Sequence, residues 1–139
     1  MENTTQKDRK EFVKRLGDDD KIETFGKTIL LIFERIDDVE KPSIIGRILS
    51  AHIRGKMTYD DAMRIAAIVN RGYLQDLIYL KVFKDGTQGN NEAVADALFS
   101  IGLLSNQGID GGSFSNPNSG GTIYAFNKFS KLLVKYGLQ

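Results

Sequence analysis

Four arginines form two pairs whose members are seven residues apart: Arg47 with Arg54, and Arg64 with Arg71. Residues seven apart lie on the same face of a helix, so each pair could bind a phosphate or another anion. The surrounding segment, Lys41 to Lys84, holds eight Lys and Arg residues against three Asp, a local charge of +5. This segment is therefore the candidate site for RNA, DNA or acidic lipid headgroups, and the alternative interpretation is an ordinary solvated surface.

Metal binding and catalysis find little support among the other reactive residues. His52 is the only histidine and there is no cysteine, so the chain offers neither a histidine pair nor a thiolate for a metal. Asp18, Asp19 and Asp20 lack the alternating spacing of a calcium loop and are explained as the cap of a following helix. We therefore expect no metal, no cofactor and no catalysis, with a cryptic small-ligand binder or enzyme as a remaining alternative.

A glycine-rich stretch, GIDGGSFSNPNSGGT, runs from Gly108 to Thr122 between two apolar segments. It lacks the Lys-Ser or Lys-Thr of a phosphate-binding loop, so we interpret it as the tip of a β-hairpin. Ile109 and Phe114 are apolar residues within this polar stretch. Burial against a partner or against the body of the protein would explain them, which makes them the candidate partner-binding residues.

The elements that must position these residues are mostly helices, because apolar residues recur every three or four positions along the chain. The predicted helices span 7–16, 22–36, 42–54, 58–83, 91–104 and 127–136. Extended segments that begin near Leu103 and end near Phe126 form the predicted hairpin. We expect a mainly α fold, a single domain over residues 1–139 with about five to seven helices and one C-terminal β-hairpin.

Two local signals refine these helices. Thr58 and Asp61 have the spacing of a capping box at the start of the helix predicted over 58–83. Gly26, Gly46 and Gly72 lie inside predicted helices, where Gly costs about 1 kcal/mol relative to Ala. We interpret the three glycines as points of close helix contact or of a local break, and we expect the helix over 58–83 to kink or break near Gly72.

The order ALFSIGLLS, a glycine-rich hairpin, TIYAF and NKFSKLLVKYG resembles the end of a winged-helix module. The segment RIDDVEKPSIIGRILSAHIRGKMTYDDAMRIAAIVNRGYLQDLIYL, followed by this ending, resembles the soluble part of an uncharacterised group of bacterial proteins. Longer members of that group carry an apolar membrane hairpin ahead of this region. The resemblance implies a helical bundle portion at 1–84 with a winged-helix-like portion at 85–139 packed on it.

A winged helix implies DNA binding, but the charges of this one oppose it. Residues 85–127 contain no Lys or Arg and four acids, Asp85, Glu92, Asp96 and Asp110, a local charge of −4. A DNA-binding wing needs cations, because neutralising phosphates supplies most of the affinity. The DGTQGN linker also leaves no room for the first helix of a helix-turn-helix. We therefore expect no binding of duplex DNA through this face.

The composition of the whole chain narrows the function classes further. Nineteen Lys and Arg against eighteen Asp and Glu leave a net charge of +1, so no global field favours nucleic acid or membranes. The longest apolar runs, Ile29 to Phe33 among them, are far shorter than the roughly 20 residues of a membrane span, and the lack of cysteine suits the cytoplasm. The favoured function is a non-catalytic interaction or regulatory module that binds a protein partner or a second copy of itself. A nucleic-acid-binding regulator that uses the basic helices of 41–84 is the alternative.

Overall fold

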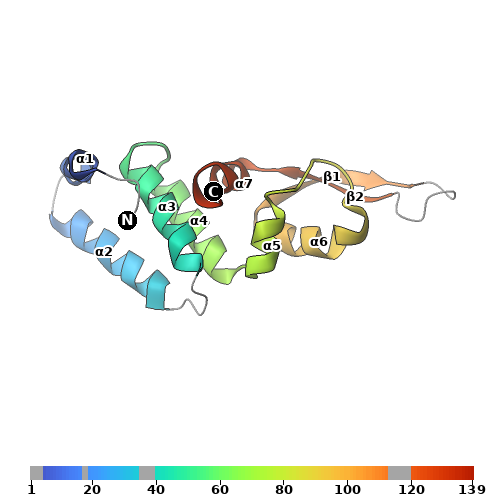
Figure 1. Cartoon of the computed structure of the whole chain (residues 1–139), viewed down its shortest axis with the longest axis horizontal. Helices are drawn as coiled ribbons and strands as arrows, with labels where there is room; N and C mark the ends of the chain where they lie inside the picture. The colour runs from blue at the N-terminus through green and yellow to red at the C-terminus, as the bar shows by residue number, and fades with distance from the viewer. Residues whose placement is uncertain (1–4, 17–18, 35–39, 113–119) are drawn as a thin grey trace. The chain divides into compact units, whose positions relative to one another are not determined.

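The structure, a computed structural model, describes residues 5–16, 19–34, 40–112 and 120–139 (Figure 1). It is mainly helical with one C-terminal β-hairpin, which confirms the predicted fold class. The chain forms two compact units, Met1–Asn70 with Gln139, and Arg71–Leu138. No helix in the described ranges is both long enough and apolar enough to cross a membrane.

The first unit is built from helices α1 (Gln6–Leu16), α2 (Asp19–Glu34), α3 (Lys41–Ile53) and α4 (Tyr59–Arg71, whose last residue belongs to the second unit). α3 begins with a proline in its first turn, where the missing N–H costs nothing. The apolar positions that predicted α3 and α4 are fully buried, among them Ile45, Ile48, Leu49, Ile53, Ile65 and Val69. Hydrophobic periodicity was therefore a sufficient guide to these two helices.

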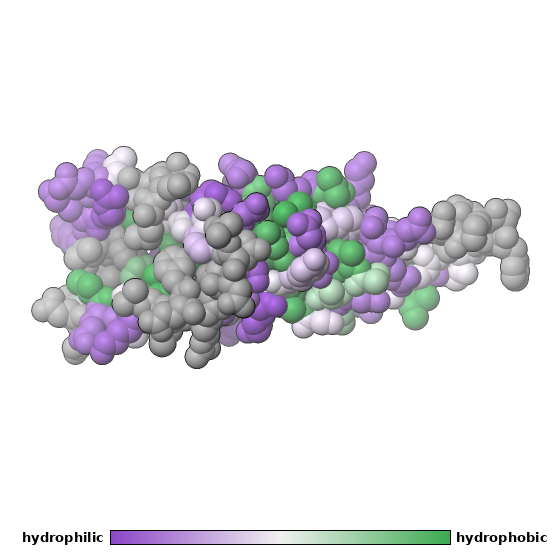
Figure 2. Space-filling model, turned by 60° about the horizontal axis from the view of Figure 1, so that its bottom comes forward, coloured by the Kyte–Doolittle hydropathy of each residue, from purple (hydrophilic) through white to green (hydrophobic). Residues whose placement is uncertain are grey.

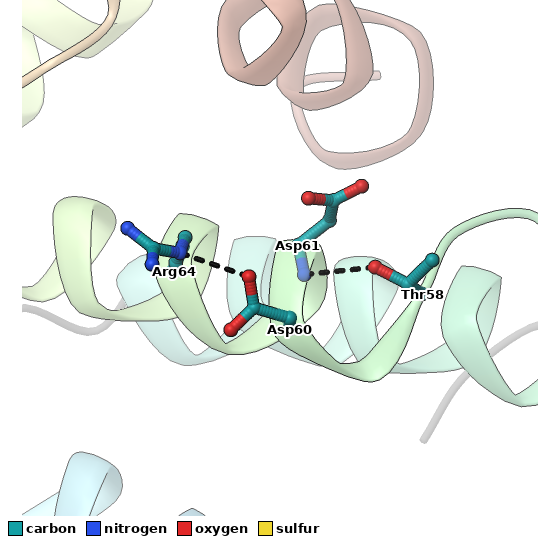
Figure 3. Close-up of polar contacts among 4 residues, drawn as sticks. All are labelled: Thr58, Asp60, Asp61 and Arg64. Atoms are coloured by element: carbon teal, nitrogen blue, oxygen red, sulfur yellow. Dashed lines mark hydrogen bonds and ion pairs between the residues drawn. The ribbon is translucent and has the colours of Figure 1, made fainter.

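The start of α4 has the predicted cap. The backbone N–H of Asp61 donates to the Thr58 hydroxyl at 3.1 Å (Figure 3), which satisfies one of the free amides of the first turn. The sequence also predicted that Asp18, Asp19 and Asp20 cap α2. Asp18 lies outside the described residues, and Asp19 and Asp20 belong to the first turn of that helix.

The second unit contains α5 (Leu74–Tyr79), a 3-10 turn (Gly89–Asn91), α6 (Glu92–Ser100), the strands β1 (Leu104–Asp110) and β2 (Gly121–Phe126), and α7 (Lys128–Leu132), which continues as a π-helical turn (Leu133–Gly137). Asn127 caps α7: its Oδ1 accepts from the N–H groups of Phe129 and Ser130, at 3.0 and 3.1 Å. The cap fixes the point at which β2 gives way to helix.

The boundary between the units lies after Asn70, whereas the sequence suggested two portions divided after Lys84. The difference arises because the residues around Lys84 belong with the hairpin. The rings of Phe83 and Phe126 have centroids 4.8 Å apart, and Gly86 pairs with Tyr124. That the chain behaves as one domain stays a prediction.

The three helical glycines have different surroundings. At Gly72 the predicted break is confirmed, since α4 ends at Arg71 and α5 begins at Leu74. A Cβ added at Gly72 would also lie 3.0 Å from Leu77 Cδ2, so both the break and the close contact are present there. At Gly26 and Gly46 the interpretation was wrong: the helices continue through them, and an added Cβ would have nothing within 4 Å.

A candidate protein-interaction hairpin

The hairpin is an antiparallel pair with one irregularity. Leu104, Ser105 and Asn106 face Phe126, Ala125 and Tyr124 in turn, and after the irregularity Gly108, Ile109 and Asp110 face Ile123, Thr122 and Gly121. Gln107 is the extra residue of this β-bulge, and Gly108 after it has a φ of +122°, a conformation that side chains rarely adopt. The bulge explains why no strict alternation of apolar and polar residues marks β1 in the sequence.

The outer edge of β2 is closed by groups from Asp85 and Gly86, which lie before α6 in the chain, and by groups from α6 itself. The N–H of Tyr124 donates to the Gly86 carbonyl at 2.9 Å, and the N–H of Gly86 donates back to Tyr124 at 2.8 Å. Asp85 Oδ1 accepts from the N–H of Phe126 at 3.2 Å. These bonds satisfy the outward amides at positions 124 and 126, and the backbone of Gly86 forms a single bridge beside β2.

Glu92 closes the same edge nearer to the tip. Its Oε1 accepts from the N–H of Thr122 at 3.1 Å. A Cβ added at Gly121 would lie 2.9 Å from Glu92 Oε2, and Gly121 has a φ of +103°. Glycine at position 121 is therefore what allows the carboxylate of α6 to reach the strand.

Asp96, one turn further along α6, holds the side chain of β2. The Tyr124 hydroxyl donates to Asp96 Oδ1, and the Tyr124 ring lies 5.8 Å from that of Phe99, centroid to centroid. Tyr124 is only 3% exposed. The hydrogen bond to the Asp96 carboxylate, together with burial and the negative charge of Asp96, raises the pKa of Tyr124 above its ordinary value.

Sequence reasoning counted Asp85, Glu92 and Asp96 only as repulsive charge and missed this bonding role. Their partners in β2 are 41, 30 and 28 residues away along the chain, so no local pattern reports them. These hydrogen bonds add no cation, so residues 85–127 still contain four acids and no Lys or Arg. They attach one strand firmly to the rest of the second unit.

The outer edge of β1 is different. Because the amides of Thr122 and Tyr124 point away from β1, their partners Ile109 and Asn106 stand in non-hydrogen-bonded pairs and also direct their backbone groups outward. In the described part of the chain, no hydrogen bond reaches these outward groups. We call the outward backbone groups of Asn106 and Ile109 the open edge.

Exposure rises steadily along β1, from buried Leu104 through half-buried Ser105 to exposed residues over 106–110. Of the two candidate partner-binding residues, Ile109 lies in this exposed end of β1 and is itself 81% exposed. Figure 2 shows hydrophobic surface beside the grey tip of the hairpin. Phe114, the second candidate, lies outside the described residues.

The four arginines of the anion-binding hypothesis are carried by α3, its C-cap and α4. Arg47 lies within α3 and Arg54 is its C-cap, while Arg64 and Arg71 belong to α4. Arg64 Nε forms an ion pair with Asp60 Oδ2 at 3.0 Å (Figure 3). Arg71 is the last residue of α4 and the first residue of the second unit, and anion binding by the four arginines stays a prediction.

Arg54 lies in surroundings of mixed charge. Its Nε donates to the Ser50 carbonyl at 3.4 Å. It also lines a shallow hollow of about 410 Å³ together with Asp8, Glu11, Lys14 and Ile53. The lining of this hollow thus contains two acids and two cations, so it has no excess of positive charge to attract an anion.

His52 is buried, as expected for a packed histidine. Its Nδ1 lies 2.9 Å from the Met57 carbonyl oxygen, and its ring packs with those of Phe25 and Tyr59 at centroid distances of 6.3 and 5.9 Å. Within the described ranges, no three His, Asp or Glu side chains are grouped as metal ligands would be.

Comparison of the chain with protein-family models, with curated proteins and with solved structures finds no match. The hairpin and its two unlike edges are therefore the features on which a function can be argued.

Proposed function

We propose that this chain is a non-catalytic protein-interaction module and that its contact element is the exposed end of the hairpin. The observation that carries the proposal is Ile109, an aliphatic side chain 81% exposed at the end of β1. Burying an isoleucine side chain stabilises a protein or a complex by about 1.5–3 kcal/mol, and the isolated chain lacks this stabilisation at position 109. A protein partner or a second copy would recover it.

The position of Ile109 in the sheet supports the same proposal. Cross-strand partners share a face, so Ile109, opposite Thr122, lies on the face that carries Tyr124. α6 covers that face at Tyr124 through Asp96 and Phe99. At Ile109 the face continues without cover from the described residues, which makes it an extension of the core that a partner can complete.

The test compares Ile109→Ser with Val82→Ser. Val82 is 69% exposed and belongs to neither strand, so it controls for the loss of an exposed aliphatic side chain. We expect both variants to keep the unfolding free energy of the wild type. Proteins captured from the native host should be purified and rebound to each variant, and the oligomeric state should be measured by light scattering.

The proposal expects Ile109→Ser to weaken rebinding, or to shift the oligomer, by about tenfold, which corresponds to about 1.4 kcal/mol of lost apolar burial. Val82→Ser should behave as the wild type does. If Ile109→Ser changes neither partner binding nor the oligomeric state, the hairpin end is not the contact element and the proposal is wrong.

A further inference from the structure

The two edges of the hairpin differ in how many of their outward backbone groups are hydrogen-bonded. On β2, the outward amides of Thr122, Tyr124 and Phe126 are satisfied by Glu92, by Gly86 and by Asp85. On β1, the open edge has no such bonds within the described chain. Exposed strand edges invite pairing with another chain, and proteins usually close them with charges, bulges or loops. Here the closing groups gather on one edge and leave the other available.

The open edge has the chemistry to accept a strand. An edge strand offers alternating N–H and C=O groups, and an extended peptide can satisfy them by adding one more strand to the sheet. The bulge at Gln107 limits the pairing to a short stretch around Asn106 and Ile109. The occupant is therefore an extended segment of a few residues, with an apolar side chain that covers Ile109.

Charge decides between a partner and a second copy. Residues 85–127 carry Asp85, Glu92, Asp96 and Asp110 and no cation, and Asp110 is the exposed neighbour of Ile109. Two copies joined at this edge would place two acidic hairpins side by side, with an Asp110 on each and no cation from residues 85–127, whereas a basic segment would complement Asp110.

We infer that the open edge of β1 binds an extended basic segment of a partner protein, which adds as a strand beside Asn106 and Ile109. This inference rests on the proposed function, because it specifies how the hairpin makes its contact and with which class of partner. The backbone pairing supplies the geometry. Ile109 and Asp110 select an apolar residue and a neighbouring Lys or Arg in the bound segment.

The inference can be tested by titrating the ¹⁵N-labelled full chain with a short, end-blocked peptide in which Lys alternates with Val, Thr and Ile. We expect saturation to slow hydrogen exchange of the Asn106 and Ile109 amides, while the amides of Thr122, Tyr124 and Phe126 exchange as before. A peptide with Glu in place of each Lys should bind about tenfold more weakly at low salt. A peptide with N-methylated backbone amides should not bind.

Asp110→Asn provides a matched protein variant, since the amide oxygen can still accept from the N–H of Gly112 as Asp110 Oδ1 does at 3.0 Å. We expect it to weaken the basic peptide by about twofold to fivefold and to leave the Glu peptide no weaker. Equal binding of both peptides to the wild type would contradict the charge assignment.

Three further results would overturn the inference. The first is that the Lys peptide does not bind, and the second is that it binds without slowing hydrogen exchange of the Asn106 and Ile109 amides. The third is slow exchange of these two amides in a dimer without peptide, which would make a second copy the occupant. The proposed function has a separate readout. A purified partner that needs Ile109 but leaves both amides exchanging freely would sustain that function and exclude strand addition.

Discussion

Tyr124 joins β2 both to Gly86 and to α6. Its backbone pairs with Gly86, its ring lies beside Phe99, and its hydroxyl donates to the Asp96 carboxylate. The hydroxyl can donate only while it is protonated, so the folded protein favours the neutral phenol. The raised pKa of Tyr124 expresses this preference.

The raised pKa makes stability depend on pH at the alkaline end. The unfolded chain ionises this tyrosine near its ordinary pKa of about 10, before the folded chain does. The contribution of Tyr124 is therefore complete below pH 10 or so and is lost as the pH rises through the folded pKa. We expect Tyr124→Phe to lower the unfolding free energy by about 1–2 kcal/mol at neutral pH.

Urea unfolding at neutral pH and above about pH 10 checks this expectation, since the difference between wild type and Tyr124→Phe should narrow as the pH rises. Tyr73→Phe is the control: Tyr73 is 68% exposed, so its substitution should cost little at either pH. A difference that stays constant with pH would show that the hydroxyl does not carry the stabilisation.

At the scale of elements, Gly46 and Gly72 both fall within helices predicted from the sequence, but their surroundings in the structure differ. Gly46 lies within the continuous helix α3 with open space where a Cβ would project. Gly72 separates α4 from α5, and a Cβ there would lie 3.0 Å from Leu77 Cδ2 and 3.1 Å from Ile101 Cδ1. Leu77 is fully buried and has little room to yield.

The two glycines therefore predict opposite effects of one substitution. Gly46→Ala should raise the unfolding free energy by about 1 kcal/mol, because alanine favours the helix and meets no neighbour. Gly72→Ala should lower it by about 1–3 kcal/mol through overpacking against Leu77. Denaturant unfolding of both variants measures the contrast, and a stabilising Gly72→Ala would mean that the contact is not tight.

The helices and the hairpin were predictable because their signals are local. Apolar spacing marks α3 and α4, the Thr58 hydroxyl marks a helix start, and the run from Thr122 to Phe126 has strand composition. Ile109 also stood out as an apolar residue in a polar stretch. The state of each strand edge was not predictable, since it depends on carboxylates that meet β2 across 28 to 41 residues and on a bulge at Gln107.

For the molecule as a whole, charge is divided along the chain. Residues 41–84 carry an excess of cations and residues 85–127 carry only acids, although the net charge is +1. Among the candidate arginines, Arg64 is paired with Asp60, and Arg54 shares its hollow with Asp8 and Glu11. The cationic segment is thus partly neutralised by its own neighbours.

This distribution predicts weak binding of duplex DNA with little dependence on salt. A gel-shift titration over a range of salt concentrations should show a shallow slope, because few phosphates are neutralised. The variant with Arg47, Arg54, Arg64 and Arg71 all changed to Ala should behave as the wild type does. A steep slope that this variant loses would instead establish the nucleic-acid alternative.

The bonds that close the edge of β2 also set an order of events during synthesis. Domains form from the N-terminus as the chain grows, and distant contacts must wait for both partners. α3 and α4 are complete once residue 71 has emerged, whereas Asp85, Glu92 and Asp96 have no strand to bind until Thr122, Tyr124 and Phe126 follow. The helices α3 and α4 can therefore form while the chain is still growing, whereas the sheet of the second unit can form only after residues 121–126 have been made.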